Sequence, residues 1–485
     1  MHNPSYIAVD LGATSGRVML GSIEGDIVLL DEVHRFPTRS LQLPDGLHWD
    51  VAQLYSEIIA GVSAAVARGA SPVGVGFDTW GVDYALLADD GRLLGLPFHH
   101  RDARTAGRST LVDDSFLYAE TGIQTLDINT LVQLRAEPPT ALAAATELLF
   151  RPDLFAYLFS GLRSAERTIA STSQLLHWSG VPSTVIPAWA GIPDLLAPMV
   201  AAGTVLGEPL AHVRAATGFS GQVITVAGHD TASAVAAIPA EEEFAFISCG
   251  TWGLVGFELA APILSERARL AGFTNEHGVD GTYRFLRNAS GLWLLTESLR
   301  AWGEPVTSES SASLVSAAAE APRYVSIIDP LDPLFLAPGD MPARIAEFCV
   351  RTGQPAPSTR AEVARCILDS LALAFADAIE AGAALTGTSP RAIHVVGGGS
   401  QIAELCQAIA DVTGVRVIAG PAEATALGNV LLQARALGQI ADLAQLRALV
   451  ARSSSPRIHE PGVVRAAADA RERFLAVVGS TSGVL

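Results

Sequence analysis

The chain has 485 residues with 32 basic and 50 acidic side chains, so its formal net charge is −18 at pH 7. The sequence contains no lysine, so all 32 cations are arginine. This excludes chemistry that needs a lysine amine, such as Schiff bases, pyridoxal phosphate anchoring and the lysine of a Walker A loop. The acidic balance argues against nucleic acid or an anionic membrane surface as a partner and favours a small ligand.

Length and cysteine content predict two large domains in a reducing compartment. A single hydrophobic core stops growing at roughly 250–300 residues, so a chain of this length should divide. The first four residues lack a basic region, and the longest uncharged stretch, residues 168–193, is broken by proline and glycine, so we expect neither a secretory signal nor a membrane span. Four scattered cysteines favour free thiols and a cytoplasmic location; only Cys349 and Cys366 are close enough in sequence to suggest a pair.

The first half of the chain alternates apolar strands with helical patterns. Strands are predicted over residues 6–10, 73–77 and 223–226 and from Val18 and Ile27, and an amphipathic helix over residues 53–68. Helices that alternate with apolar strands favour an α/β fold.

The second half opens like the first. The acidic run at residues 241–243 predicts a domain boundary, and the strand at 244–248 feeds a Gly/Thr-rich turn, as the strand before Asp10 does. Such a repeat suggests two duplicated domains that face a common cleft. A capping box at Thr359 predicts a helix as far as Glu380. Further on, the sequence predicts a strand at 393–396, a glycine turn at 397–400 and a helix at 401–413.

Asp10 and the residues after it form the first candidate site. A carboxylate at the end of a strand can hold Mg²⁺, and a following turn of Gly, Thr and Ser offers hydrogen-bond donors to phosphate oxygens. Without lysine, these donors and the metal must neutralise the phosphates. The alternative is an aspartate that caps an ordinary β-turn.

The second candidate site is the segment from Gly228 to Ser233. Asp230 follows a strand and precedes a small-residue helix, so it can accept a proton from an alcohol that attacks phosphorus. The alternative is that Asp230 or Thr231 is only the N-cap of that helix. His229 could hydrogen-bond a hydroxylated ligand, or it could be a structural histidine.

A third segment, residues 77–84, places a glycine and a carboxylate beside Trp80. Polyol recognition uses such polar groups next to an aromatic face, although a hairpin with a core tryptophan would look the same. His99 and His100 are not expected to bind a metal, because neighbouring side chains on an extended chain point to opposite faces.

Together these motifs resemble the FGGY carbohydrate kinases, and within that family most of all the rhamnulokinases, from about Ile7 to about Leu432. The segments that carry the resemblance are VDLGATSGRVML, FDTWGVDY, RDART, AGHDTASAVAA, CGTWGLVG, TNEHGVDGTYR, RNASGLWLL and VVGGGSQIAELCQAIAD. The resemblance implies two actin/Hsp70-like (ribonuclease H-like) α/β domains that flank a deep cleft. Residues 1–240 would bind sugar and carry the first phosphate loop and catalytic aspartate, and residues 241–485 would bind nucleotide.

The implied reaction is transfer of the γ-phosphoryl group of ATP to O1 of L-rhamnulose, with Mg²⁺. The resemblance makes Asp230 the catalytic base and Asp10 the carboxylate that organises Mg²⁺. The residues implied to contact the sugar are Gly81, His229, Asp230, Thr231 and Asn288. Those implied to contact ATP are Ala13, Thr14, Ser15, Gly16 and Arg17 in the first phosphate loop, Thr251 in the second, and Gly398 on the adenosine side.

Three positions depart from the family pattern. Cys249 stands where serine is common, His100 where tyrosine is common, and Thr296 where a glutamine near ATP is expected, which leaves a contact between Thr296 and ATP open. Two other functions stay open: another FGGY ketose kinase, acting on fuculose, xylulose or ribulose, and a non-catalytic actin-like ATP-binding protein. The carboxylate after His229 and the TWGVD and NEHGVDG segments argue against the second. Monomer and homodimer are both compatible with the sequence.

Overall fold

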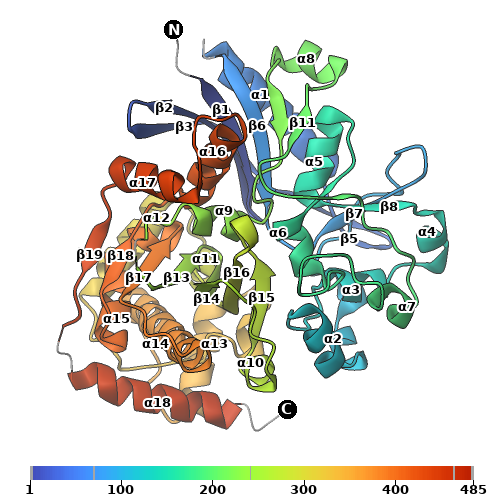
Figure 1. Ribbon diagram of the computed structural model, residues 1–485. Helices are drawn as coiled ribbons and strands as arrows, with labels where there is room; N and C mark the ends of the chain where they lie inside the picture. The colour runs from blue at the N-terminus through green and yellow to red at the C-terminus, as the bar shows by residue number, and fades with distance from the viewer. Residues whose placement is uncertain (1–3, 69–70, 241, 463–464, 482–485) are drawn as a thin grey trace. The chain divides into compact units, whose positions relative to one another are not determined.

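A computed structural model describes residues 4–68, 71–240, 242–462 and 465–481. The chain divides into two compact units (Figure 1). Unit 1 comprises Met1–Pro239, Glu258–Phe285 and Ala424–Ser454, and unit 2 comprises Ala240–Phe257, Leu286–Glu423 and Ser455–Leu485. Both contain sheets and helices, which confirms the predicted α/β class. The functional division at residues 240/241 stays a prediction, and Glu241 itself lies outside the described residues.

The predicted helices and strands occur in the expected order, together with others that the sequence analysis did not predict, among them α12, α13 and α16 to α18. As far as residue 236 they are β1 Ser5–Leu11, β2 Ser15–Glu24, β3 Ile27–Pro37, β4 Ser40–Leu43, β5 Gly46–Trp49, α1 Val51–Ala67, β6 Pro72–Thr79, β7 Tyr84–Leu87, α2 Asp114–Thr121, α3 Thr130–Leu134, α4 Pro139–Ala144, β8 Glu147–Phe150, α5 Arg151–Ser160, β9 Ala165–Glu166, α6 Arg167–Ala170, α7 Ile186–Ala190, β10 Met199–Val200, β11 Val205–Gly207, α8 Ala211–Thr217, β12 Gln222–Ile224 and α9 Asp230–Ala236. After it they are β13 Phe244–Cys249, β14 Trp252–Leu259, α10 Glu266–Leu270, β15 Phe273–His277, β16 Tyr283–Ser290, α11 Trp293–Ala301, α12 Ser308–Ala319, α13 Met341–Arg351, α14 Arg360–Thr386, β17 Ala392–Val396, α15 Ala403–Thr413, β18 Val417–Ala419, α16 Ala424–Ala436, α17 Leu443–Ser453, β19 Arg457–His459 and α18 Arg465–Thr481.

The main sheet of unit 1 has the strand order β11-β12-β6-β1-β2-β3. Strand β1 pairs in parallel with β6 and antiparallel with β2, and Asp10 of β1 is the register partner of Asp78 of β6. Successive side chains of a strand point to opposite faces of its sheet. Asp10 and Asp78 therefore lie side by side on one face.

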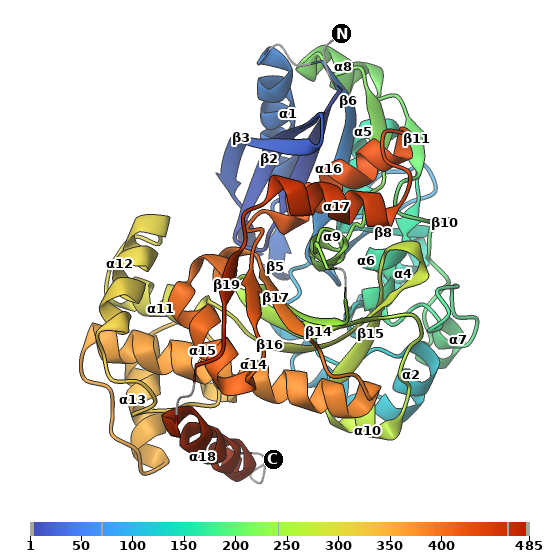
Figure 2. The same cartoon turned by 60° about the vertical axis from the view of Figure 1, so that its left-hand side comes forward.

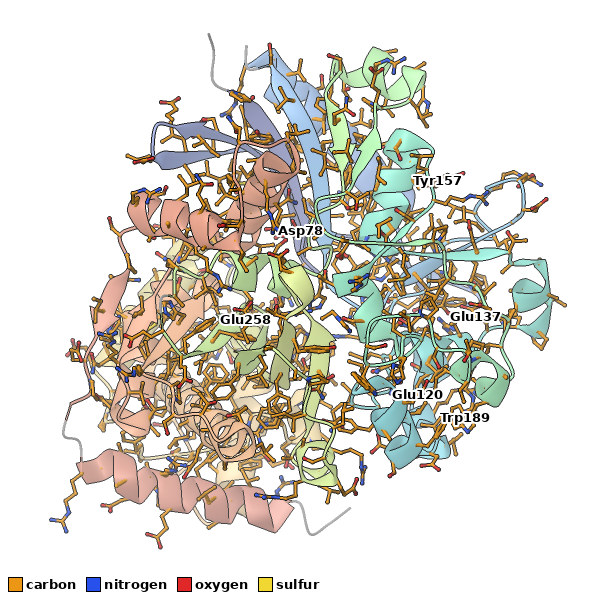
Figure 3. All side chains as sticks on the ribbon, viewed as in Figure 1. Asp78, Glu120, Glu137, Tyr157, Trp189 and Glu258 are labelled. Atoms are coloured by element: carbon orange, nitrogen blue, oxygen red, sulfur yellow. The ribbon has the colours of Figure 1, made fainter. Side chains whose placement is uncertain are left out.

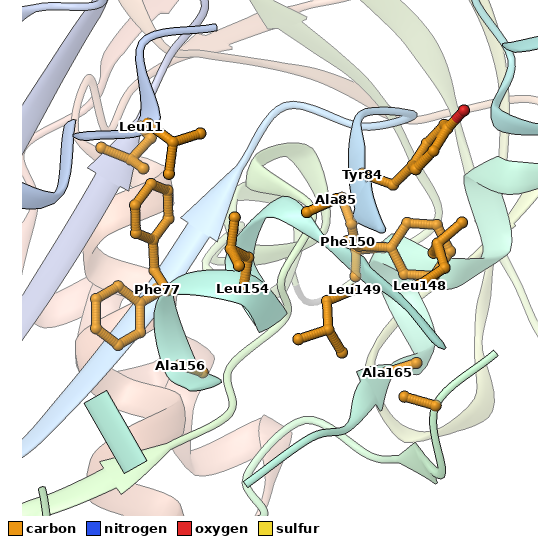
Figure 4. Close-up of a cluster of buried hydrophobic side chains, with 14 of the residues drawn as sticks. Leu11, Phe77, Tyr84, Ala85, Leu148, Leu149, Phe150, Leu154, Ala156 and Ala165 are labelled. Carbon is orange, nitrogen blue, oxygen red and sulfur yellow. The ribbon is translucent and has the colours of Figure 1, made fainter. Parts of the chain in front are cut away.

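The opposite face of this sheet packs against the largest part of the hydrophobic core. Leu11 of β1 and Phe77 of β6 lie next to each other (Figure 4), and the ring of Phe77 packs against Phe155 and Phe159 of α5, with ring centroids 6.4 and 5.0 Å apart. Helix α1 adds Leu54, Ile58 and Val62 to the same core. This packing holds the carboxyl ends of β1 and β6 in place.

Helix α16 covers the face that carries the two aspartates, and glycines let it approach closely. A Cβ atom on Gly74 would lie 2.6 Å from Oε1 of Gln433, and one on Gly76 would lie 2.7 Å from Oδ1 of Asn429. A Cβ atom on Gly428 would lie 2.0 Å from the carbonyl oxygen of Ser233, so α16 also fits tightly against α9. The polar side chains of α16 thereby reach the ends of β1 and β6.

The second sheet has the strand order β15-β16-β14-β13-β17-β18-β19, in which β17 pairs in parallel with both β13 and β18. Helix α14 opens with the predicted capping box, in which Thr359 and Glu362 bond each other's backbone, and it continues to Thr386, beyond the predicted end. Helix α18 packs against α14 and α15 (Figure 2). The helix predicted over 401–413 starts at Ala403, because Gly398–Gln401 forms a 3₁₀ turn.

The described helices include none long and apolar enough to cross a membrane.

Candidate active site

Asp10 is nearly buried near the end of β1 and forms an ion pair with Arg17, its register partner on β2. The turn between the strands is short: the backbone N–H of Gly12 donates to the carbonyl oxygen of Ser15 at 3.0 Å. The predicted loop over residues 13–17 is therefore wrong in its extent, since Ser15, Gly16 and Arg17 belong to β2. A Cβ atom on Gly16 would lie 2.4 Å from the ring of Phe36, which explains this glycine by packing.

Asp78, labelled in Figure 3, is a fully buried carboxylate that the sequence analysis did not select, and it is the register partner of Asp10. Its Oδ2 accepts a hydrogen bond of 2.5 Å from Nδ2 of Asn429, whose Oδ1 in turn accepts one of 2.7 Å from Gln433. Its Oδ1 has no hydrogen-bond partner within the described part of the chain. Burial and the nearby charge of Asp10 raise the pKa of Asp78 well above its ordinary value, and the bond from Asn429 opposes them.

Asp230 is the first residue of α9, and its carboxylate remains accessible. Its Oδ1 accepts hydrogen bonds from the backbone N–H of Thr231 at 2.5 Å and from the Thr231 hydroxyl at 3.1 Å. The cap alternative is wrong for this pair, because His229 occupies the N-cap position and makes no side-chain cap bond within the described residues. The Asp230 side chain is 31% exposed. A carboxylate in this position can meet a ligand.

The pKa of Asp230 suits a general base. Burial and the charge of Asp10 raise this pKa to about 7, although Thr231 and Arg284 oppose the shift. A base works best when its pKa lies close to the operating pH.

The His229 side chain is buried, and Arg284 contacts one edge of its imidazole ring. Its Nδ1 lies 3.0 Å from a guanidinium nitrogen of Arg284, and burial and that positive charge lower the pKa of His229 well below its ordinary value. The other side of the ring faces Gly81: a Cβ atom there would lie 3.0 Å from Nε2 of His229 and 3.2 Å from Oγ1 of Thr172. Glycine at position 81 thus leaves the Nε2 edge of the imidazole uncovered on this side.

The backbone before Asp230 is anchored by Glu166, another buried residue that sequence reasoning missed. Its Oε2 accepts from the backbone N–H groups of Gly228 at 3.0 Å and Thr168 at 2.9 Å, and from the Thr168 hydroxyl at 2.5 Å. The N–H of His229 donates to Thr168 Oγ1 at 3.3 Å. Glu166 therefore ties the start of α6 to the start of α9.

The segment around Trp80 is organised by the buried Asp83. Its Oδ2 accepts from Nε1 of Trp49 at 2.8 Å, Nε1 of Trp80 at 2.5 Å and Nδ1 of His100 at 2.9 Å. Burial acts to raise the pKa of Asp83, but the charge and hydrogen bond of His100 outweigh it and lower that pKa to about 2. The expectation that His99 and His100 point apart is wrong, because their rings lie 4.6 Å from each other and both pack on Trp49.

Three predicted ligand-binding residues belong to unit 2. Thr251 follows β13 and Gly398 follows β17, so the two lie at the carboxyl ends of neighbouring parallel strands, and a Cβ atom on Gly398 would lie 3.9 Å from the carbonyl oxygen of Cys249. Asn288 lies on β16. Thr296 lies on α11, where its backbone N–H donates to the carbonyl oxygen of Leu292 at 3.0 Å. A contact between Thr296 and ATP stays a prediction.

The predicted sugar contacts and the predicted ATP contacts are each divided between the two units. Asp10, residues 13–17, Gly81 and residues 229–231 lie in unit 1, and Thr251, Asn288 and Gly398 lie in unit 2. The additional residues that support the unit 1 site are Asp78, Glu166, Glu276, Arg284, Asn429 and Gln433. A pattern could have indicated Asp78, since it lies one residue before the end of β6 and its same-face neighbours on that strand, Gly74 and Gly76, are glycines.

The donors of this site are suited to Mg²⁺. Among the described residues, no three or more His, Cys, Asp or Glu side chains are arranged to hold a metal by themselves. Mg²⁺ usually binds one or two carboxylates together with substrate phosphates and water. Asp10 supplies a carboxylate, and the unpartnered Oδ1 of Asp78 adds a second hard oxygen on the same sheet face. The four cysteines, including Cys349 and Cys366, are free and buried.

Sequence comparison defines the class of protein. Residues 5–237 match the N-terminal domain, and residues 245–437 the C-terminal domain, of the FGGY family of carbohydrate kinases. The chain therefore belongs to this family, whose members share the two-domain actin/Hsp70-like ATPase fold.

Within this family, the chain is similar to rhamnulokinases in sequence and to other sugar kinases in structure. The chain is 40% identical to a rhamnulokinase of Bacteroides thetaiotaomicron over 94% of its own length and 96% of the relative's. It is 42% identical to a rhamnulokinase of Pectobacterium carotovorum, over 91% and 90%. Among solved structures it resembles a gluconate kinase from Lactobacillus acidophilus, with a TM-score of 0.80 and 14% identity over 100% and 98% of the two chains, and a xylulose kinase from Rhodospirillum rubrum, with a TM-score of 0.77 and 21% identity over 99% of each. The structures support the fold alone.

Proposed function

We propose that this chain is an ATP-dependent kinase that transfers the γ-phosphoryl group of ATP to O1 of L-rhamnulose. The choice of sugar is supported by the two rhamnulokinases above, which match the chain nearly end to end at 40% and 42% identity. The observation that supports phosphoryl transfer is the Asp230 carboxylate, which is 31% exposed at the start of α9 and has a pKa raised to about 7.

In the proposed reaction Asp230 orients the sugar O1 hydroxyl and accepts its proton as that oxygen attacks the γ-phosphorus. The transition state of phosphoryl transfer is loose, so the protein contributes chiefly position and charge. His229, with its Nε2 edge beside Gly81, and Thr231 and Asn288 are the proposed sugar contacts. The absence of a side chain at position 81 is consistent with a ligand beside the imidazole.

The nucleotide is proposed to bind through the turn after β1 and the two glycine-containing turns of unit 2. Ala13, Thr14 and Ser15 offer backbone and hydroxyl donors, Gly16 and Arg17 follow on β2, and Thr251 and Gly398 complete the predicted set. Mg²⁺ is proposed near Asp10, where bound metal would offset phosphate charge. In a chain without lysine, Arg17 is a cation in this predicted loop, and it pairs with Asp10.

The remaining predictions belong to this proposal. Four free cysteines agree with the predicted cytoplasmic location. The choice between monomer and homodimer, and the functional division into residues 1–240 and 241–485, stay predictions.

The test is ADP formation with L-rhamnulose, L-fuculose, D-xylulose and D-ribulose, measured side by side with Mg²⁺ and ATP. We expect the highest kcat/KM for L-rhamnulose. A higher kcat/KM for another ketose would replace the proposed substrate. Absence of sugar-dependent ADP formation with all four, especially with polymer formation on addition of ATP, would refute the kinase and favour the actin-like scaffold.

A further inference from the structure

We infer that Arg284 is a positioning residue that acts through His229: its guanidinium donates to Nδ1 and so keeps the ring proton on Nε2, the edge that faces Gly81. In this tautomer His229 presents an N–H donor to a sugar hydroxyl. The inference rests on the proposed function only for the identity of the group that receives this hydrogen bond.

The guanidinium is held so that it cannot turn away. Arg284 lies on β16 with a side-chain exposure of 0%, and its Nε and Nη2 donate to the carbonyl oxygen of His277 at 3.3 and 3.2 Å. Its Nη1 forms an ion pair with Oε2 of Glu276 at 2.9 Å and lies 3.0 Å from Nδ1 of His229. The fork is thus anchored to β15 on one side and to the imidazole on the other.

The direction of the hydrogen bond to His229 follows from chemistry. An arginine carries donors and no acceptor, so Nδ1 must be the acceptor and cannot hold a proton. Burial and the positive charge of Arg284 keep the ring neutral by lowering its pKa. A neutral imidazole with an unprotonated Nδ1 carries its single proton on Nε2.

The surroundings of the ring show why this anchor is needed. Oε2 of Glu276 lies 3.7 Å from Nδ1 of His229, and Oδ1 of Asp230 lies 3.9 Å from Nε2. Without Arg284, the unpaired carboxylate of Glu276 would attract the proton to Nδ1. The Nε2 atom would then become an acceptor next to the carboxylate of Asp230, and the donor to the sugar would be lost.

The first measurement is the tautomer itself, read from the ¹⁵N shifts of the histidine rings in protein labelled at histidine. His229→Gln assigns the signal of His229. We expect Nε2 protonated and Nδ1 unprotonated from pH 6 to 9 in the wild-type protein. In Arg284→Met we expect a proton on Nδ1. A wild-type spectrum with a protonated Nδ1 overturns the inference, whatever the enzyme acts on.

The second measurement is steady-state kinetics at pH 8.5. Loss of one donor to a buried hydroxyl should raise the KM for L-rhamnulose about tenfold to a hundredfold in Arg284→Met, with the KM for ATP changed by less than about twofold. Arg284→Lys keeps one donor, so it should recover part of the affinity. An unchanged sugar KM in a folded Arg284→Met protein overturns the inference.

Arg365→Met is the matched control. Arg365 is also buried and paired with a carboxylate, Asp369 at 2.6 Å, but it lies on α14 in unit 2. Arg365→Met should lower the melting temperature without changing the sugar KM or the His229 tautomer. If Arg284→Met does not fold, the inference is tested by the wild-type ¹⁵N spectrum and by the sugar KM of Arg284→Lys. If the wild-type protein forms no ADP with any ketose, the proposed function is wrong. The ¹⁵N spectra still test whether Arg284 sets the tautomer of His229.

Discussion

The reactivity proposed for Asp230 arises from its neighbours. Burial removes water from most of the carboxylate, and the charge of Asp10 on the adjacent strand end disfavours ionisation. Thr231 and Arg284 act in the opposite direction, and the balance brings the pKa to about 7. At neutral pH such a carboxylate exchanges protons readily, which is what a general base requires.

Replacing Asp10 should change the titration of Asp230. In Asp10→Asn the repulsion is gone, so the pKa of Asp230 should fall, by about one pH unit at this partly exposed site. The side-chain ¹³C carboxyl signal that disappears in Asp230→Asn reports this pKa in protein free of metal and nucleotide. An unaltered midpoint would show that Asp10 does not influence the base.

The raised pKa also predicts how stability depends on pH. The carboxyl group has an ordinary pKa of 3.8 and a folded value of about 7, so the folded state prefers the protonated form. Stability is therefore lost as pH rises from about 4 to about 7, and the loss is complete above that range. Asp230→Asn should unfold like wild type near pH 4 and be more stable at pH 8.5, on the order of 2 kcal/mol because water still reaches the group. Urea unfolding at both pH values measures this; an equal difference at both contradicts it.

At the scale of residues, the sequence indicated the proposed reactive residues and missed those that support them. Asp10 lies next to the end of β1, and His229 and Asp230 stand at the start of α9, so a local pattern indicates all three. Arg284 lies 55 positions from His229 in the sequence, and the two side chains meet only through tertiary packing. No spacing rule relates such residues.

At the scale of elements, the position of Asp230 depends on the fit between α9 and α16. Gly428 of α16 faces the backbone of Ser233 in α9, where a Cβ atom would lie 2.0 Å from a carbonyl oxygen. Backbone cannot rotate aside as a long side chain can. A methyl group there must separate the two helices.

Gly428→Ala should therefore lower both stability and turnover. We expect a loss of about 1–3 kcal/mol from overpacking, together with a fall in kcat because α9 carries Asp230. Gly479→Ala is the control: Gly479 is an exposed residue of α18, and apart from its chain neighbours and its own helix backbone no atom of the described residues lies within 4 Å of the added methyl, so the change should be neutral or slightly stabilising. Chemical unfolding and ADP assays of both variants measure the effects. Wild-type activity in Gly428→Ala would show that the helix contact does not position the base.

Glu166 provides a second test at the same scale. Glu166→Ala leaves the buried N–H groups of Gly228 and Thr168 without their acceptor, which should cost about 3 kcal/mol and reduce kcat. Glu166→Gln keeps a carbonyl oxygen and should lose markedly less. Melting temperatures and turnover of the pair check this; equal losses in both would mean that the charge, rather than the acceptor, matters.

Element positions were largely predictable, and their ends were not. The apolar runs at 6–10, 73–77 and 244–248 are strands, and the capping box at Thr359 begins a helix, because short apolar runs and capping boxes are local features. The turn after β1 is shorter than predicted, since the pairing of Arg17 with Asp10 extends β2. That pairing is a property of the sheet.

At the scale of the whole molecule, the two compact units are not consecutive halves of the chain, because each is built from three separate segments. Residues 258–285 and 424–454 group with the first unit, which brings α16 and Arg284 to the site around Asp230. The two family matches instead divide the chain into consecutive halves, at 5–237 and 245–437. Motifs along the chain reveal the family and its halves, whereas the return of distant segments to unit 1 depends on tertiary packing.

The central claim is that Asp230 is the base of a sugar kinase, and Asp230→Asn tests it most directly. Sugar-dependent ADP formation should be measured with L-rhamnulose and saturating Mg²⁺ and ATP at pH 8.5, with ATP binding followed by calorimetry. We predict a fall in kcat of about 10²–10⁴-fold, with ATP affinity unchanged within about twofold. Turnover that stays within about threefold of wild type in a variant that still binds ATP would contradict the account.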